Sequence, residues 1–156
     1  MELESRLWDV IQTRSLGMLG LTKSGLHFQP VVAFLERNRK RLWFVAPGDC
    51  EMVRSIGNGG SAMFVVQDID ILASIGGAVR IVEDRRRVER LWNTTACLWH
   101  PEGLHDPSLV ILRMDCVDAE VSISDMGVTR FVWELAGAFG SRPPVTIPGA
   151  TPATLH

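Results

Sequence analysis

The chain has 156 residues, of which 46% are hydrophobic and 22% charged, a composition ordinary for a globular protein with one buried core. Its formal net charge of −2 excludes the broad positive field that draws nucleic acid or anionic membranes to a protein, so neither partner is expected. No apolar run reaches membrane-spanning length, and the acidic start Met1-Glu2-Leu3-Glu4 differs from the basic and then apolar start of a secretory signal. The three cysteines form no CxxC pair: Cys50, Cys97 and Cys116. We therefore expect reduced thiols and a cytoplasmic location.

The first half of the chain predicts a helix followed by strands joined in hairpins. Apolar residues at helical spacing mark one face of the opening helix: Leu3, Leu7, Val10 and Ile11. Strands are predicted at residues 16–21, 27–34 and 41–46. Pro30 is an unusual residue for a central strand. The segment 47–49, Pro-Gly-Asp, is expected to end the third strand and to cap a short helix that runs to Ile56.

The second half predicts more strands and a second amphipathic helix. Strands are expected at residues 62–66, 71–82, 109–116 and 121–123. Gly76-Gly77 inside the second of these indicates a bulge, a bend or a close backbone approach. Asp84 is a suitable N-cap for a helix over 83–93. The apolar residues expected on the inner face of this helix are Val88, Leu91, Trp92 and Ala96. Residues 129–139 read as a closing helix.

Hairpin connections dominate this order of elements, so the sheet should be mainly antiparallel and curled into a barrel. We expect residues 1–140 to form a single domain of mainly β structure. The Pro-rich segment 141–156 is expected to be an extended or disordered tail.

The motifs that could carry catalysis or metal binding have simpler structural explanations. Gly57-Asn58-Gly59-Gly60 lacks the GK[ST] of a phosphate loop and is typical of a turn that ends a helix. No GxSxG elbow or Ser-His-Asp arrangement is present, so no catalytic residue is predicted. The four candidate metal ligands have no zinc-site spacing, and a metal site is not expected: His100, Glu102, His105 and Asp106. The two arginine-rich clusters, at 37–41 and 85–90, are interpreted as solvated surface.

Trp99 is the strongest single candidate for a binding residue. Five Trp and no Tyr occur in the chain, and Trp offers a large flat π face to a ligand. Trp99 opens a loop rich in Pro, Gly and Asp that runs to Pro107 between a helix and a strand. We predict that it forms an aromatic wall of a ligand site, with core packing or a dimer contact as the alternatives.

Several motifs together resemble a known family over residues 3 to about 123. They are Leu7-Trp8-Asp9-Val10-Ile11, Gln29-Pro30-Val31, Trp43-Phe44-Val45, Asp49 to Arg54, Glu83 to Trp92, Trp99 to Pro107 as WxPxGxxDP, Leu112-Arg113 and Ala119-Glu120. This pattern resembles the flavin-binding split barrels related to pyridoxamine 5'-phosphate oxidase, and specifically their general-stress-protein branch. The last third of the chain carries the most specific part of the resemblance.

The resemblance implies a six-stranded antiparallel split β-barrel that forms a homodimer, with FMN in clefts at the dimer interface. The cofactor-binding residues carried over are Phe28, Gln29, Pro30, Val31, Phe44, Val45, Ala46, Met52, Arg54 and Trp99. In the family, basic residues usually hold the phosphate where this chain has Gln29 and Met52, which supply little or no charge-assisted hydrogen bonding. Arg54 or Lys23 are the candidates to replace them.

Three functions are consistent with this resemblance. The first is an FMN-dependent oxidoreductase, in which the flavin carries the electrons and no acid or base side chain is required. The second is a non-catalytic dimer that binds a flavin or another planar small molecule. The third is a structural dimer with an empty cleft.

Overall fold

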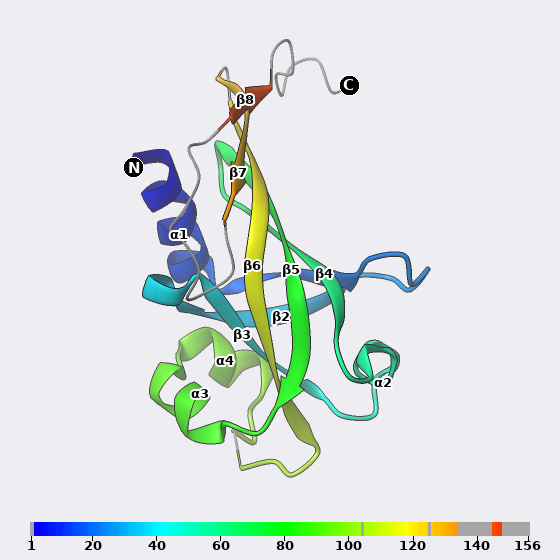
Figure 1. Cartoon of the computed structure of the whole chain (residues 1–156). Coiled ribbons are helices and arrows are strands. Elements are labelled where there is room, and N and C mark those ends of the chain that lie inside the picture. The colour runs from blue at the N-terminus through cyan, green and yellow to red at the C-terminus, as the bar shows by residue number, and fades with distance from the viewer. Residues whose placement is uncertain (1, 104, 125, 134–144, 148–156) are drawn as a thin grey trace.

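Figure 1 shows a twisted barrel of antiparallel strands with short helices around it. The computed structural model describes residues 2–103, 105–124, 126–133 and 145–147. The strands in these ranges are β1 Leu16–Leu21, β2 Gln29–Glu36, β3 Arg41–Pro47, β4 Gly60–Gln67, β5 Ile71–Val82, β6 Leu109–Ile123, β7 Gly127–Val132 and β8 Val145–Ile147. The helices there are α1 Glu2–Arg14, α2 Glu51–Ile56, α3 Arg85–Leu91 and α4 Thr94–Trp99, with the 3₁₀ helix η1 at Arg37–Arg39.

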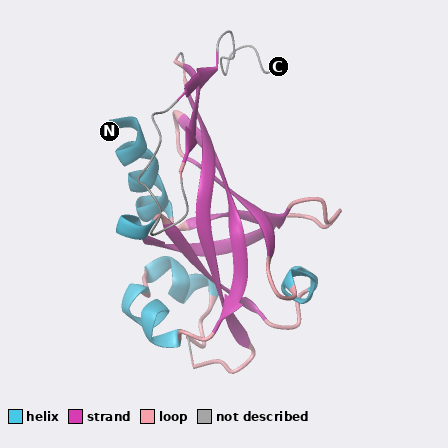
Figure 2. Cartoon of the chain, in the orientation of Figure 1, coloured by secondary structure: helices cyan, strands magenta, loops and turns pink. Residues whose placement is uncertain are grey.

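The first six strands close on themselves. The sheet has the order β3-β2-β1-β4-β5-β6-β7-β8, and an additional pairing of β3 with β6 completes the ring. Every pairing is antiparallel. Closure gives each of β1 to β6 a neighbouring strand on both sides over part of its length, which limits the free edges of the sheet. The six-stranded antiparallel split barrel predicted from the sequence is therefore confirmed, and β7 and β8 extend the sheet beyond it (Figure 2).

The barrel interior is apolar because alternate strand residues point inward. Phe44 and Phe64 are fully buried there, with ring centroids 5.3 Å apart. Helix α1 packs against β2 and β4 and adds the buried Leu7 and Ile11 to the same core. The helix is also fixed to the residue after β7, since the indole N–H of Trp133 donates a 2.7 Å hydrogen bond to Glu4 Oε1.

The glycine pair in β5 lies at a register shift, as predicted. Gly76 faces Asp118 of β6 whereas Gly77 faces Cys116, so Val117 is the extra residue of a bulge. A Cβ atom on Gly77 would lie 2.4 Å from the carbonyl oxygen of Asp115. Gly77 therefore permits a backbone approach that a larger residue would prevent.

A second apolar cluster covers the outer face of β2, β3 and β6 beneath α3 and α4. Val88 and Ala96 are fully buried there, and Leu91 and Trp92 pack against the cluster, as the helix pattern predicted. The predicted N-cap is also confirmed, since Asp84 accepts a hydrogen bond from the backbone N–H of Arg87.

The structure corrects four details of the sequence prediction. The helix expected over 83–93 is α3, and a separate helix α4 follows, so Trp99 ends a helix and does not open a loop. The strands expected at 109–116 and 121–123 are one strand, β6, continuous through the bulge. Helix α2 begins at Glu51 with Cys50 as its N-cap and no side-chain cap, so Asp49 does not cap it.

The fourth correction concerns the predicted closing helix at 129–139. Residues 127–132 form β7, which pairs with β6 from Asp118↔Val132 to Ile123↔Gly127, and the remainder, 134–139, lies outside the described residues. Of the predicted tail, residues 145–147 form β8, which pairs with β7. No helix in the described ranges is long and apolar enough to cross a membrane.

Candidate functional site

Strands β2 and β3 pair over only part of their described length. Their ladder runs from Ala33↔Phe44 to Glu36↔Arg41. Residues 29–32 of β2 pair instead with β1, and residues 45–47 of β3 pair with β6. The two strands therefore separate at this end of the barrel.

A hollow of about 280 Å³ lies where these strands separate. Residues 29–32 of β2 and 45–47 of β3 form two of its walls. Cys50 and Met52, at the start of α2, and Trp99 and His100, at the end of α4, complete the lining. Most of these side chains are apolar, which is typical of a site for a flat organic ring.

Seven of the ten cofactor-binding residues predicted from the resemblance line this one hollow: Gln29, Pro30, Val31, Val45, Ala46, Met52 and Trp99. The other three do not line it. Phe28 lies against Gly20, where its ring occupies the space of a Cβ atom. Phe44 is in the barrel interior, and Arg54 is exposed on α2.

Four lining residues were not predicted as site residues: Val32, Pro47, Cys50 and His100. Burial lowers the pKa of His100 from its ordinary value, and the nearby Asp106 carboxylate opposes this only in part. His100 is therefore mainly neutral at pH 7. One ring nitrogen of a neutral imidazole can donate a hydrogen bond to a ligand and the other can accept one, without a fixed charge. The sequence signal that could have identified His100 is its position directly after Trp99, because adjacent residues at the end of a helix lie close to the same site.

Local contacts hold Trp99 beside the barrel. The Asn93 side chain caps α4 by accepting a 2.8 Å hydrogen bond from the N–H of Ala96, and donates 3.1 Å to Ser15 Oγ just before β1. Trp92 stacks on Phe34 of β2, with ring centroids 5.8 Å apart. Trp99 itself remains 47% exposed, so it offers a flat face at a fixed position.

A second hollow of about 230 Å³ adjoins the first and shares Gln29, Cys50 and Met52 with it. It extends along the segment before β2 and is also lined by residues 25–27 and Glu51. The Gln29 side chain is turned back along its own chain, where Nε2 donates a 3.3 Å hydrogen bond to the carbonyl oxygen of His27.

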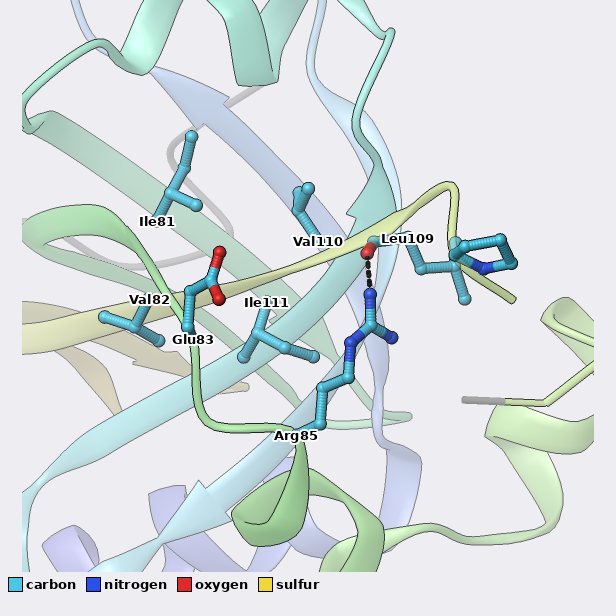
Figure 3. Close-up of a pocket in the computed structure, with 8 residues that line it drawn as sticks. Ile81, Val82, Glu83, Arg85, Leu109, Val110 and Ile111 are labelled. Atoms are coloured by element: carbon cyan, nitrogen blue, oxygen red, sulfur yellow. Dashed lines mark hydrogen bonds between the residues drawn. The ribbon is translucent and has the colours of Figure 1, made fainter. Parts of the chain in front are cut away.

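A third hollow, of about 390 Å³, lies at the ends of β5 and β6 (Figure 3). Arg85 reaches across it and donates a 2.5 Å hydrogen bond to the carbonyl oxygen of Leu109. Glu83, Ile81 and Val110 also line it. None of the predicted site residues lies in this hollow, so the split between β2 and β3 is the stronger candidate.

The sequence matches the family described as pyridoxamine 5'-phosphate oxidase like over residues 2–141. The chain belongs to this family. Among solved structures, the general stress FMN/FAD binding protein of Xanthomonas citri is 28% identical, with a TM-score of 0.68 over 88% of this chain and 96% of that chain. The comparison with curated proteins gave no match.

Two solved structures of lower sequence identity share the fold. General Stress Protein 26 of Bacillus anthracis str. Sterne is 18% identical, with a TM-score of 0.65 over 78% of this chain and 94% of that chain. A pyridoxamine 5'-phosphate oxidase-related, FMN binding protein of Nostoc punctiforme PCC 73102 is 11% identical, with a TM-score of 0.62 over 94% and 98%. The resemblance stated from the sequence motifs is thus confirmed.

The residues of the site fit the ring of FMN but not its phosphate. Val31, Val45 and Ala46 would give such a ring apolar walls, and Trp99 would offer it an aromatic face. A phosphate dianion instead requires charge-assisted donors such as Arg or Lys. Neither residue type lines the two adjoining hollows in the described part of the chain, and the acidic residue Glu51 is in the lining of the second one.

Proposed function

We propose that this protein binds the isoalloxazine ring of a flavin in the split between β2 and β3, and acts as a flavin-dependent oxidoreductase. The observation that carries the proposal is that seven residues, predicted from the family resemblance and distributed over four segments of the chain, line one hollow. The similar Xanthomonas citri and Nostoc proteins are FMN/FAD binding and FMN binding proteins, respectively, which supports a flavin as the ligand class.

A bound flavin would supply the electron transfer, and the protein would supply binding and environment. Val31, Val45 and Ala46 are each at most 4% exposed, so they would exclude water from one side of the ring. Trp99 would cover part of the ring by stacking. His100, mainly neutral because burial lowers its pKa, would exchange a hydrogen bond with a polar edge of the ligand.

Flavin binding without turnover is the second candidate function. It is favoured by the lining of Met52, Gln29 and Glu51 where a phosphate would need cations. Such a protein would hold or carry a flavin and would show no steady oxidation of a reductant.

We also propose that a second copy of the chain completes the site. Trp99 is 47% exposed at the hollow, and Met18, which pairs with Pro30 at its rim, is 40% exposed. Covering this apolar rim would remove it from water, which is the main source of association energy. A mass near twice 17.3 kDa by light scattering would support the homodimer, and a monomer at every tested concentration would refute it. The cytoplasmic location expected from the sequence is part of the same proposal.

The test is reconstitution. Purified protein is incubated with riboflavin and with FMN, separated from free flavin by gel filtration, and examined by visible absorption. We expect a retained flavin band with altered shape, since an apolar environment changes the ring spectrum. A colourless protein in both cases would contradict flavin binding. Oxidation of NADH or NADPH by the coloured protein, with a quinone or oxygen as acceptor, then separates the oxidoreductase from the carrier.

A further inference from the structure

We infer that the site selects among flavins by disfavouring a terminal phosphate, so that riboflavin binds at least as tightly as FMN. This inference rests on the proposed function, because it assigns the tail of the flavin to the hollow next to the ring. It would make an uncharged flavin the ligand class of this chain. The two hollows and the charges around them carry the inference.

The hollow next to the split offers a direction for the tail of the ligand. The hollow at the split, about 280 Å³, is near the lower limit of small-molecule sites, which leaves little room beyond the ring. The adjoining hollow shares Gln29, Cys50 and Met52 with it. A ring against β2 and β3 therefore places its ribityl chain along the start of α2.

The start of α2 is a poor place for a dianion. Glu51, an acidic residue, is part of the lining of the second hollow. Met52 is 3% exposed and packed into the barrel core, and its thioether has no hydrogen-bond donor. The backbone N–H groups at this helix end attract anions, but α2 has only six residues and Glu51 occupies its first turn. Glu51 is therefore an acidic residue in the lining where a phosphate would lie, and among the described residues the same lining contains no Arg or Lys.

No Arg or Lys lines either hollow in the described part of the chain. Arg54 is exposed on α2 and belongs to the lining of neither one. Lys23 lies in the turn after β1, also outside both linings. A ribityl hydroxyl needs no charged partner, and the amide of Gln29, which lines the second hollow, has an oxygen that can accept its hydrogen bond.

The test compares dissociation constants for riboflavin and FMN on the full chain by equilibrium dialysis. We expect FMN to bind no more tightly than riboflavin. Replacing Glu51 by Lys in E51K should tighten FMN relative to riboflavin by about tenfold, because a repelling carboxylate becomes a charge-assisted donor. The matched control is E89K, which makes the same charge change at an exposed position of α3 outside both hollows and should leave the ratio unchanged.

Each outcome decides the inference. FMN bound tenfold or more tightly than riboflavin by the unmodified protein would overturn it while leaving the proposed function intact. Equal shifts in E51K and E89K would also overturn it, since net charge and not the local site would then set the preference. Binding of neither flavin would overturn the proposed function and the inference together.

Discussion

Replacing Trp99 by Ala should weaken flavin binding without unfolding the protein. Trp99 lines the hollow at the β2–β3 split and is 47% exposed, so about half of its surface is free to contact a ligand. Stacking of an aromatic side chain on a flat heterocycle contributes about 1–3 kcal/mol. A half-available indole should lie near the lower end of that range, about 1.4 kcal/mol, which corresponds to about a tenfold larger dissociation constant.

The assay is titration of protein into riboflavin, followed by the quenching of flavin fluorescence. Leu98→Ala is the matched control, because Leu98 is the preceding residue of α4, is 77% exposed and lines none of the described hollows. Thermal unfolding should change by about 2–4 °C or less in both variants, since neither side chain is a core residue. A dissociation constant for Trp99→Ala within twofold of the unmodified value, or equal weakening by Leu98→Ala, would refute the assignment of Trp99 to the site.

Two further predictions concern the barrel that supports the site. Gly77→Ala should destabilise the protein by about 1–3 kcal/mol, because the new Cβ would lie 2.4 Å from the backbone oxygen of Asp115. The control is Gly60→Ala, whose new Cβ would meet no atom within 4 Å. Urea unfolding measures the stability of both variants, and equal stability would contradict the close approach at Gly77. Burial raises the pKa of the Cys116 thiol far above its ordinary value, so it should stay protonated and unreactive in the folded protein while the exposed Cys97 is labelled by a thiol reagent at pH 8. Labelling of both at the same rate before unfolding would show that the barrel interior is open.

The sequence predicted the barrel well where burial imposes a period of two. Along β5 the inward residues alternate regularly, and Gly76-Gly77 correctly marked the irregularity. The bulge also explains the error in β6. Its buried residues change phase between Cys116 and Ala119, so the alternation seemed to end where the strand in fact continues. A bulge involves the partner strand and is only partly visible in one strand's pattern.

The mistaken closing helix has a different cause. Phe131 and Trp133 alternate and are both buried, which agrees with a strand, but such a short apolar run fits either a helix or a strand. The good helix-forming residues that follow favoured the helix. Residues 127–132 form a strand because they pair with β6. The local sequence pattern carries no information about such long-range pairing.

The candidate site was predicted through family motifs more than through local physics. Phe44 pairs with Ala33 inside the β2–β3 ladder and lies in the barrel interior, whereas Val45 and Ala46 lie beyond the end of that ladder and line the hollow. Val32 and Pro47 entered the lining because β2 and β3 separate beyond Ala33. That separation depends on each strand pairing with a different third strand, which the sequence alone did not reveal.

The most direct test of the central claim is a crystal structure of the protein with bound riboflavin. We predict that the isoalloxazine ring lies between residues 29–32 of β2 and 45–47 of β3, with Trp99 against it. A ring bound instead in the hollow beside Arg85 (Figure 3), or elsewhere on the surface, would contradict the assignment of the β2–β3 split as the flavin site.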